Sequence, residues 1–289
     1  MRKLPVIFVL LLLMSLGLSL RIRYVYSQTP SPAVVEENDE FDEAYTSYLK
    51  GVEEYQIVHN EYILRRSQYL NFKTLKSQQD AHDATVKMLQ ARDNVVIIYL
   101  VALKARLQEA IGIAPARSEG LKIRIDEERG WFTEHRNEVS SAGTLDDLVS
   151  DSNEAEKHFL SVEPLFYEIL SVIAQGRITD FTERTDELTM QVDAKVEQIR
   201  SDDRSEYTFS SDKFSVLDRW MFEAENRVTR SKEKQIEADV NILDYSRKRG
   251  GSIISNYNSI SSTLGEAQLF LKEANTFLKE IIREIKTAE

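Results

Sequence analysis

The chain has 289 residues, of which 42% are hydrophobic and 29% charged, as in an ordinary globular protein. It contains no cysteine, which excludes disulfides, zinc–thiolate sites and thiol catalysis. The net charge is −11, and −15 without residues 1–27, which carry four basic residues and no acid. A body this acidic repels phosphate backbones and anionic headgroups, so we expect no binding to nucleic acid.

The N-terminus has the pattern of a targeting segment. Arg2 and Lys3 precede an uncharged apolar stretch from Leu4 to Leu20, and Val25 and Ser27 supply the small residues of a cleavage site. Cleavage near Ser27 would release a secreted or periplasmic protein.

A retained membrane anchor is the alternative. The stretch Leu4–Leu20 approaches the length that spans a bilayer, and Arg21 and Arg23 separate it from the cleavage site. Either way the rest of the chain is expected outside the cytoplasm, with membrane contact only through this segment if it is uncleaved. Residues 28–40 read as a flexible acidic linker, and residues 41–289 as the body.

The body is predicted to be all-α, a bundle of about six helices, several of them long. Between Val52 and Ile111 there is no glycine or proline, and apolar residues recur at steps of three and four. The first helix is expected to begin between Glu37 and Asp42. Four tyrosines with a spacing of seven lie on its inward face, namely Tyr48, Tyr55, Tyr62 and Tyr69.

A break is expected between Asn71 and Ser77, because the apolar stripe changes phase there and one straight helix cannot keep both phases on one face. Ser77 and Asp80 predict the capping box of the second helix, which folds back on the first. The apolar run Val95–Leu103 is assigned to this second helix, covered on several sides.

Further helices follow in the middle of the chain. Gly112 and Pro115 are expected to close the second helix. A third is predicted from Ser118 to about Ser140, and its inward positions are Leu121, Ile125, Phe132 and Val139.

Thr144, with Asp147 three residues later, is predicted to cap a fourth helical segment. Pro164 and Gly176 are expected to divide that segment. Residues 201–212 form the clearest internal linker and a possible subdivision of the body.

The last two helices carry sustained heptad stripes and are predicted to form an antiparallel coiled-coil hairpin. Ser211 and Ser252 are the expected N-caps. The stripe of the first helix consists of Phe214, Leu217, Met221, Ala224, Val228, Ser231, Gln235, Ala238, Ile242 and Tyr245. The stripe of the second consists of Tyr257, Ile260, Leu264, Ala267, Leu271, Ala274, Leu278, Ile281 and Ile285.

The tyrosine stripe has two interpretations. A packing seam against the second helix is favoured, because phenolic rings bury a large apolar area while the hydroxyl reaches the rim. An aromatic groove for a peptide or a glycan is the alternative.

Polar residues interrupt the two facing stripes and predict pairs that fix the helix register. A hairpin that turns near residue 74 would place Arg66 level with His82 and Tyr55 level with Asp93. These residues are therefore predicted to pair. His59 lies on the same stripe as Arg66. Two lone histidines are too few ligands for a metal, and no cofactor is expected.

Other polar residues receive structural interpretations. His135 and His158 are expected at the surface or rim of the bundle. The sequence has neither a glycine-flanked nucleophile turn nor a glycine-rich phosphate loop. We therefore expect no enzymatic activity.

These features favour a non-catalytic scaffold or interaction protein of a bacterial-type cell envelope, which binds another protein or self-associates through its helices. The alternative is a small-ligand-binding extracytoplasmic domain. An N-terminal apolar segment followed by a helical bundle resembles the sensor domains of bacterial receptors, although no second membrane span or signalling module is evident.

Overall fold

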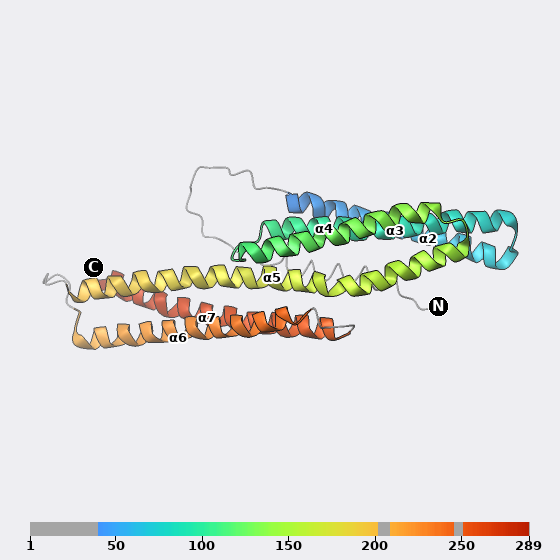
Figure 1. Cartoon of the computed structure of the whole chain (residues 1–289). Coiled ribbons are helices and arrows are strands. Elements are labelled where there is room, and N and C mark those ends of the chain that lie inside the picture. Colours follow the sequence, from blue (N-terminus) through green and yellow to red (C-terminus); the bar gives the residue numbers. More distant parts are fainter. Residues whose placement is uncertain (1–39, 202–208, 246–250, 289) are drawn as a thin grey trace. The chain divides into compact units, whose positions relative to one another are not determined.

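The computed structural model describes residues 40–201, 209–245 and 251–288, and within these ranges the chain forms six α-helices and no strand (Figure 1). The all-α prediction is confirmed. The targeting segment and nearly all of the linker 28–40 lie outside the described residues. The elements are α2 (Glu40–Phe72), α3 (Leu75–Gln108), α4 (Pro115–Glu138), the 3-10 helix η1 (Val139–Ser141), α5 (Leu145–Arg200), α6 (Ser211–Leu243) and α7 (Gly251–Ala288).

The chain divides into two compact units, each with its own core. The first contains α2, α3, most of α4 and the start of α5. The second contains residues 109–119, the rest of α5, and the pair α6 and α7.

In the first unit, α2 and α3 form the predicted hairpin, with a two-residue turn at Lys73 and Thr74. Lys73 adopts a positive φ of 45°, which reverses the chain. The cap lies three residues earlier than predicted: Thr74 Oγ1 accepts from Ser77 N at 3.1 Å, and Ser77 Oγ accepts from Thr74 N at 3.0 Å. Asp80 instead pairs with Lys76.

The rest of the first unit follows the predicted pattern. Helix α4 begins at Pro115, three residues before the predicted start, and its first five residues belong to the second unit. The four inward residues predicted for that helix are all buried. Thr144 and Asp147 form the predicted reciprocal cap at the start of α5, with bonds of 3.1 and 2.9 Å between side chain and backbone.

The expected division at Pro164 and Gly176 is wrong, because α5 runs through both as one helix of 56 residues. Pro164 removes the donor for the carbonyl of Leu160, but Leu160 lies at an exposed position where water can replace that donor. Gly176 leaves room for the chain near Ile111, since a Cβ there would lie 2.5 Å from the Ile111 carbonyl oxygen.

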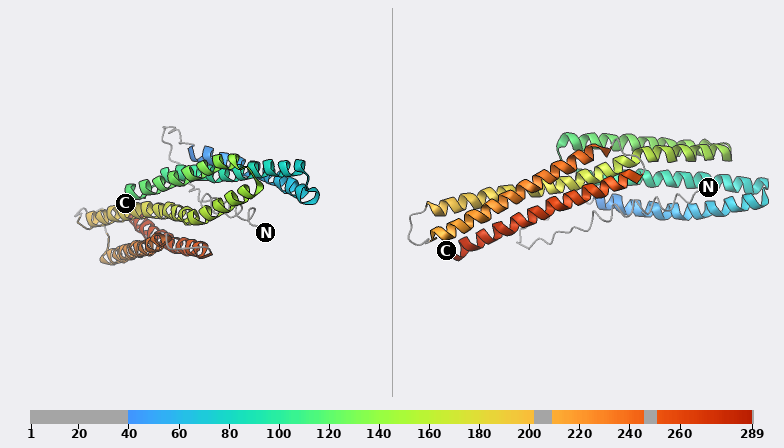
Figure 2. Two further views of the ribbon diagram at one scale, coloured as in Figure 1. Left: turned by 45° about the vertical axis from the view of Figure 1, so that its right-hand side comes forward. Right: turned by 90° about the horizontal axis from the view of Figure 1, so that it is seen from below.

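In the second unit, α6 and α7 pack as the predicted antiparallel hairpin (Figure 2). All members of the two heptad stripes are buried except Phe214 and Tyr257, which are half-buried. The N-cap of α6 is Ser210, one residue before the predicted Ser211. Helix α7 begins at Gly251, so Ser252 lies within its first turn.

A polar layer interrupts this core. Gln235 of α6 donates to Thr182 Oγ1 of α5 at 2.7 Å and to Ser231 Oγ at 3.2 Å. Asn275 of α7 donates to Thr185 Oγ1 at 3.2 Å. Because buried polar groups need partners, this layer fixes the register of the three helices.

Candidate functional site

The tyrosine stripe is divided along its length. Tyr48 and Tyr55 are buried in the seam between α2 and α3, where the ring of Tyr48 lies 5.5 Å from that of Tyr99. Burial raises the pKa of both phenols. Tyr62 and Tyr69 are half-buried, so the seam loosens toward the turn of the hairpin.

Three members of the pairs predicted across the hairpin have other partners in the structure, namely Tyr55, His82 and Asp93. The Tyr55 hydroxyl lies 3.5 Å from His59 Nδ1, one helical turn away. His82 has its ring nitrogens near the Asp83 carboxylate and, at 3.0 Å, the carbonyl oxygen of Ala142. The partners of His82 and Asp93 lie outside the hairpin, in the α4–α5 connection and in α4. Arg66 is half-buried on α2.

The partner of Asp93 is His135, which is 5% exposed rather than at the surface. His135 Nδ1 donates to Asp93 Oδ2 at 2.6 Å, and Nε2 donates to the Asp151 carbonyl oxygen at 3.1 Å. Both partners can only accept, so His135 satisfies both when its ring carries two protons. Arg92 Nε lies 3.5 Å from the other oxygen of Asp93.

The pKa of His135 follows from two opposing effects. Burial lowers it, and Arg92 also opposes a second positive charge. The hydrogen bond and the charge of Asp93, together with the Asp151 carbonyl, outweigh these and raise the pKa above its ordinary value.

Trp131 lies between two histidine rings. Its ring centroid is 5.0 Å from that of His135 and 3.6 Å from that of His158, with interplanar angles of 11° and 16°. His158 is half-buried, which agrees with the predicted rim position, and it bonds Glu128 at 2.7 Å. We name Asp93, Trp131, His135 and His158 the histidine–tryptophan cluster.

The sequence contained one signal for this cluster. His135 continues the inward series of its helix, three residues after Phe132 and four before Val139, so its position predicts burial. What the sequence could not supply is the partner, because Asp93 comes from a helix 42 residues away.

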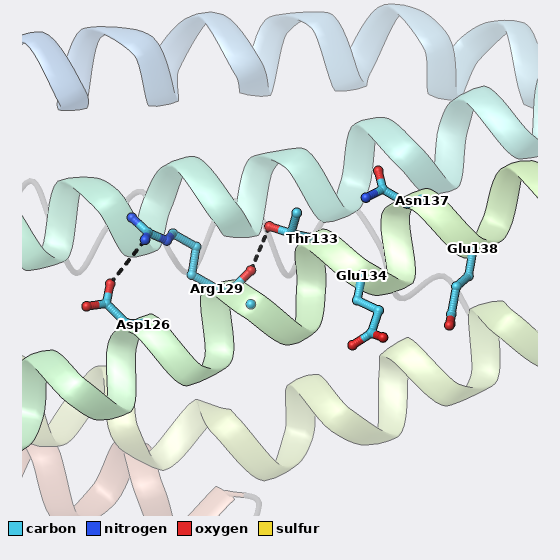
Figure 3. A pocket seen from close by; sticks show the side chains of 7 residues that line it. Asp126, Arg129, Thr133, Glu134, Asn137 and Glu138 are labelled. Carbon is cyan, nitrogen blue, oxygen red and sulfur yellow. Dashed lines mark hydrogen bonds and ion pairs between the residues drawn. The ribbon is translucent and has the colours of Figure 1, made fainter.

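The first unit has two grooves, of which the first includes two residues of the cluster. One is lined by Trp131, His158, Lys157, Glu154, Asn153 and Ser150 and has a volume of about 590 Å³. The other follows one side of α4, where Asp126, Arg129, Thr133, Glu134, Asn137 and Glu138 are aligned (Figure 3). Arg129 pairs with Asp126 at 3.4 Å, and Thr133 bonds the Arg129 carbonyl.

In the second unit, a groove of about 330 Å³ lies between residues 112–117, α5 and α6. Gly112, with φ of 69°, packs so closely on Gly176 that a Cβ would lie 2.0 Å from the Gly176 carbonyl oxygen. Arg117 spans the groove and bonds Asp239 at 2.5 Å and Gln175 at 3.4 Å.

The described ranges contain no group of three or more histidine, aspartate or glutamate side chains that could hold a metal ion. Within the same ranges, no helix combines the length and apolarity that a bilayer span requires. Comparisons with protein-family models, curated proteins and solved structures find no match.

Proposed function

We propose that this chain is a non-catalytic helical scaffold of the cell envelope that binds another protein through the outer face of α6. The observation that carries the proposal is a second apolar stripe on this helix. Phe222, Ile236, Val240 and Leu243 are each at least 63% exposed.

Helix geometry places these four side chains together. Ile236, Val240 and Leu243 are spaced i, i+4 and i+7, and Phe222 lies on the same side two heptads before Ile236. The inner stripe of α6 is already filled by the core, so this outer face is available for a partner.

The groove beside this face supports a helical or extended partner. Ile236 and Val240 also line the groove that contains Ile113, which continues the apolar surface past α6. The Arg117–Asp239 ion pair borders it and can orient the polar edge of a partner.

A photo-reactive amino acid at Ile236 in the intact chain tests the proposal in the native cell. We expect a cross-linked product of defined mass, identified by mass spectrometry as one partner or as a second copy. The matched control is Met190 on α5, which is 64% exposed and outside this face. Indistinguishable products at both positions, or none at Ile236, would contradict the proposal.

Export is tested separately, by the intact mass of the chain recovered from cell fractions. A mass that begins at Gln28, in the medium or periplasm, supports a free exported scaffold. A full-length chain in the membrane fraction supports an anchored one, and a full-length chain in the cytoplasm contradicts both.

A small-ligand-binding sensor-like domain is the second candidate, and the groove of the second unit favours it. Its volume lies in the range of ligand pockets, and Arg117, Gln175, Thr179 and Gln235 converge on it. A metabolite that raises the melting temperature of wild type but not of Arg117→Ala would support this candidate. Equal shifts in both proteins would place the ligand elsewhere.

A further inference from the structure

The turn of the α2–α3 hairpin presents apolar side chains to water. Phe72 is the last residue of α2 and Leu75 the first of α3, and they are 71% and 84% exposed. Between them lie Lys73 and Thr74, and Lys76 follows. Two large apolar side chains at the end of a hairpin, each next to a lysine, have no role in the core of their unit.

These residues are exposed because the hairpin is longer than the helices that cover it. The bond from His82 to the Ala142 carbonyl places the α4–α5 connection level with residue 82. The hairpin therefore continues past that connection by about seven residues of α3, or about 10 Å. Figures 1 and 2 show the turn of the hairpin beyond the α4–α5 connection. We call residues 57–80, which are the turn, the last 16 residues of α2 and the first six of α3, the hairpin tip.

Apolar exposure continues around the tip. Four further large apolar side chains of α2 are about half-exposed or more, namely Ile57, Ile63, Leu64 and Leu70. Ile63 and Leu64 are consecutive, so they point about 100° apart. A flat protein surface would cover only one of these directions, whereas a lipid interface can surround the end of a hairpin on several sides.

The charge of the tip differs from that of the chain. It carries four basic residues and two acids, a net charge of +2, whereas the whole chain has −11. Both acids are engaged, Glu61 by Arg65 at 2.6 Å and Asp80 by Lys76 at 2.7 Å. Charges farther away than about 8–10 Å are largely screened at physiological ionic strength, so an approaching surface senses mainly the tip.

We propose that the hairpin tip binds an anionic lipid surface. Phe72 and Leu75 enter the boundary between headgroups and acyl chains, and Lys73 and Lys76 contact the phosphates while their stems lie along the apolar side chains. Binding at this surface is independent of the protein-binding face proposed for α6.

The absence of cysteine allows a direct test with the full chain. Asn71→Cys, labelled with an environment-sensitive fluorophore, reports on the tip alone and so separates it from the apolar N-terminal segment. The probe is a vesicle of phosphatidylcholine with 30 mol% phosphatidylglycerol, compared with phosphatidylcholine alone. The matched control is Met190→Cys with the same label.

On the anionic vesicles we expect a blue shift in the emission of the fluorophore at residue 71 and no shift in that of the fluorophore at residue 190. Adding Lys73→Gln and Lys76→Gln should reduce the partition coefficient reported at residue 71 by about 30-fold, since each cation near the surface contributes about fivefold. Phe72→Ser with Leu75→Ser should reduce it by at least about tenfold. Circular dichroism verifies that each variant keeps its helices.

Three outcomes overturn the proposal. One is the absence of a shift at residue 71 on anionic vesicles. Another is an equal shift at residues 71 and 190. The third is a shift that appears without lipid and grows with added unlabelled protein, which would assign the tip to a second copy of the chain.

Discussion

His135 combines burial with two hydrogen-bond acceptors, and this arrangement makes the stability of the first unit depend on pH. The groups that face it are Asp93 and Arg92 from α3, Trp131 from its own helix, and the Asp151 carbonyl from α5. The folded state binds the second proton of the imidazole more tightly than the unfolded chain does, because Asp93 stabilises the charged ring.

We expect His135→Gln to lower the free energy of unfolding by about 3 kcal/mol at pH 5.5, as in the disruption of a buried pair. The difference from wild type should shrink as the pH rises through the folded pKa, which lies above 6.5. Urea unfolding at pH 5.5, 7 and 8.5 measures this difference. A difference that is constant over this range would contradict the assignment.

His59 provides a control of opposite sign. Burial lowers its pKa, so the folded state favours the neutral ring. The contribution of His59 to the free energy of unfolding should therefore decline as the pH falls through the ordinary pKa of 6.5 toward the folded pKa. His59→Gln should thus remove a pH dependence opposite to that removed by His135→Gln.

Tyr48 permits a second prediction at this scale. Its ring is fully buried, and its hydroxyl has no hydrogen-bond partner among the residues that the structure describes. Tyr48→Phe should leave the free energy of unfolding unchanged or raise it by up to about 1 kcal/mol, because a buried unsatisfied group is removed. Tyr245→Phe is the matched control and should cost about 1 kcal/mol, since the Tyr245 hydroxyl lies 3.2 Å from Ser171 Oγ. Thermal or urea unfolding that shows the same loss of unfolding free energy in both variants would contradict this explanation.

Sequence reasoning at the residue scale identified buried positions better than partners. The inward faces of the helices follow from periodicity, so Tyr48 and Phe132 could be placed in the core. The observed partners of His82 and Asp93 could not be predicted, because Ala142 and His135 come from distant parts of the chain.

At the scale of elements, helix ends were predictable where a local motif determines them. The cap formed by Thr144 depends only on residues within one turn. Pro164 and Gly176 each carry a local cost within a helix, and this cost alone predicts a break. Around Pro164 a run of buried apolar side chains, including Leu165, Phe166 and Ile169, outweighs one missing hydrogen bond.

The close approach of Gly112 and Gly176 yields a prediction for these elements. Gly176→Ala should lower the free energy of unfolding by about 2 kcal/mol or more, since its Cβ would overlap backbone and Ile113 atoms. Gly265→Ala on α7 is the control, because nothing lies within 4 Å of its added Cβ. That change should stabilise the protein by about 1 kcal/mol through helix propensity. A melting temperature of the Gly176→Ala variant above that of wild type would contradict the packing described.

At the scale of the whole molecule, the helices form two compact units, and the boundary between them in the second half of the chain follows Phe159 of α5 rather than the linker 201–212. The heptad stripes correctly predicted the hairpin of α6 and α7, and the break near residue 73 predicted that of α2 and α3. The division of α5 between the two units was not predictable, because buried apolar side chains continue across the boundary after Phe159, from Ala155 and Phe159 to Val162 and Leu165.

The two cores should respond separately to core substitutions. Leu103 and Leu271 are both fully buried, in the first and the second unit respectively. Each change to alanine should cost about 3 kcal/mol. Hydrogen exchange should lose protection mainly in α2–α4 for Leu103→Ala and mainly in α6 and α7 for Leu271→Ala. The same loss of protection throughout the chain in both variants would show a single cooperative unit.

The exposed side chains of the hairpin tip also have a calorimetric consequence. Apolar surface that leaves water lowers the heat capacity of the system. Any event that buries Phe72 and Leu75 should therefore become more exothermic as the temperature rises. Because the variant with serine at both positions lacks this surface, its enthalpy should vary less with temperature, and the difference between the two slopes measures how much of the tip becomes buried.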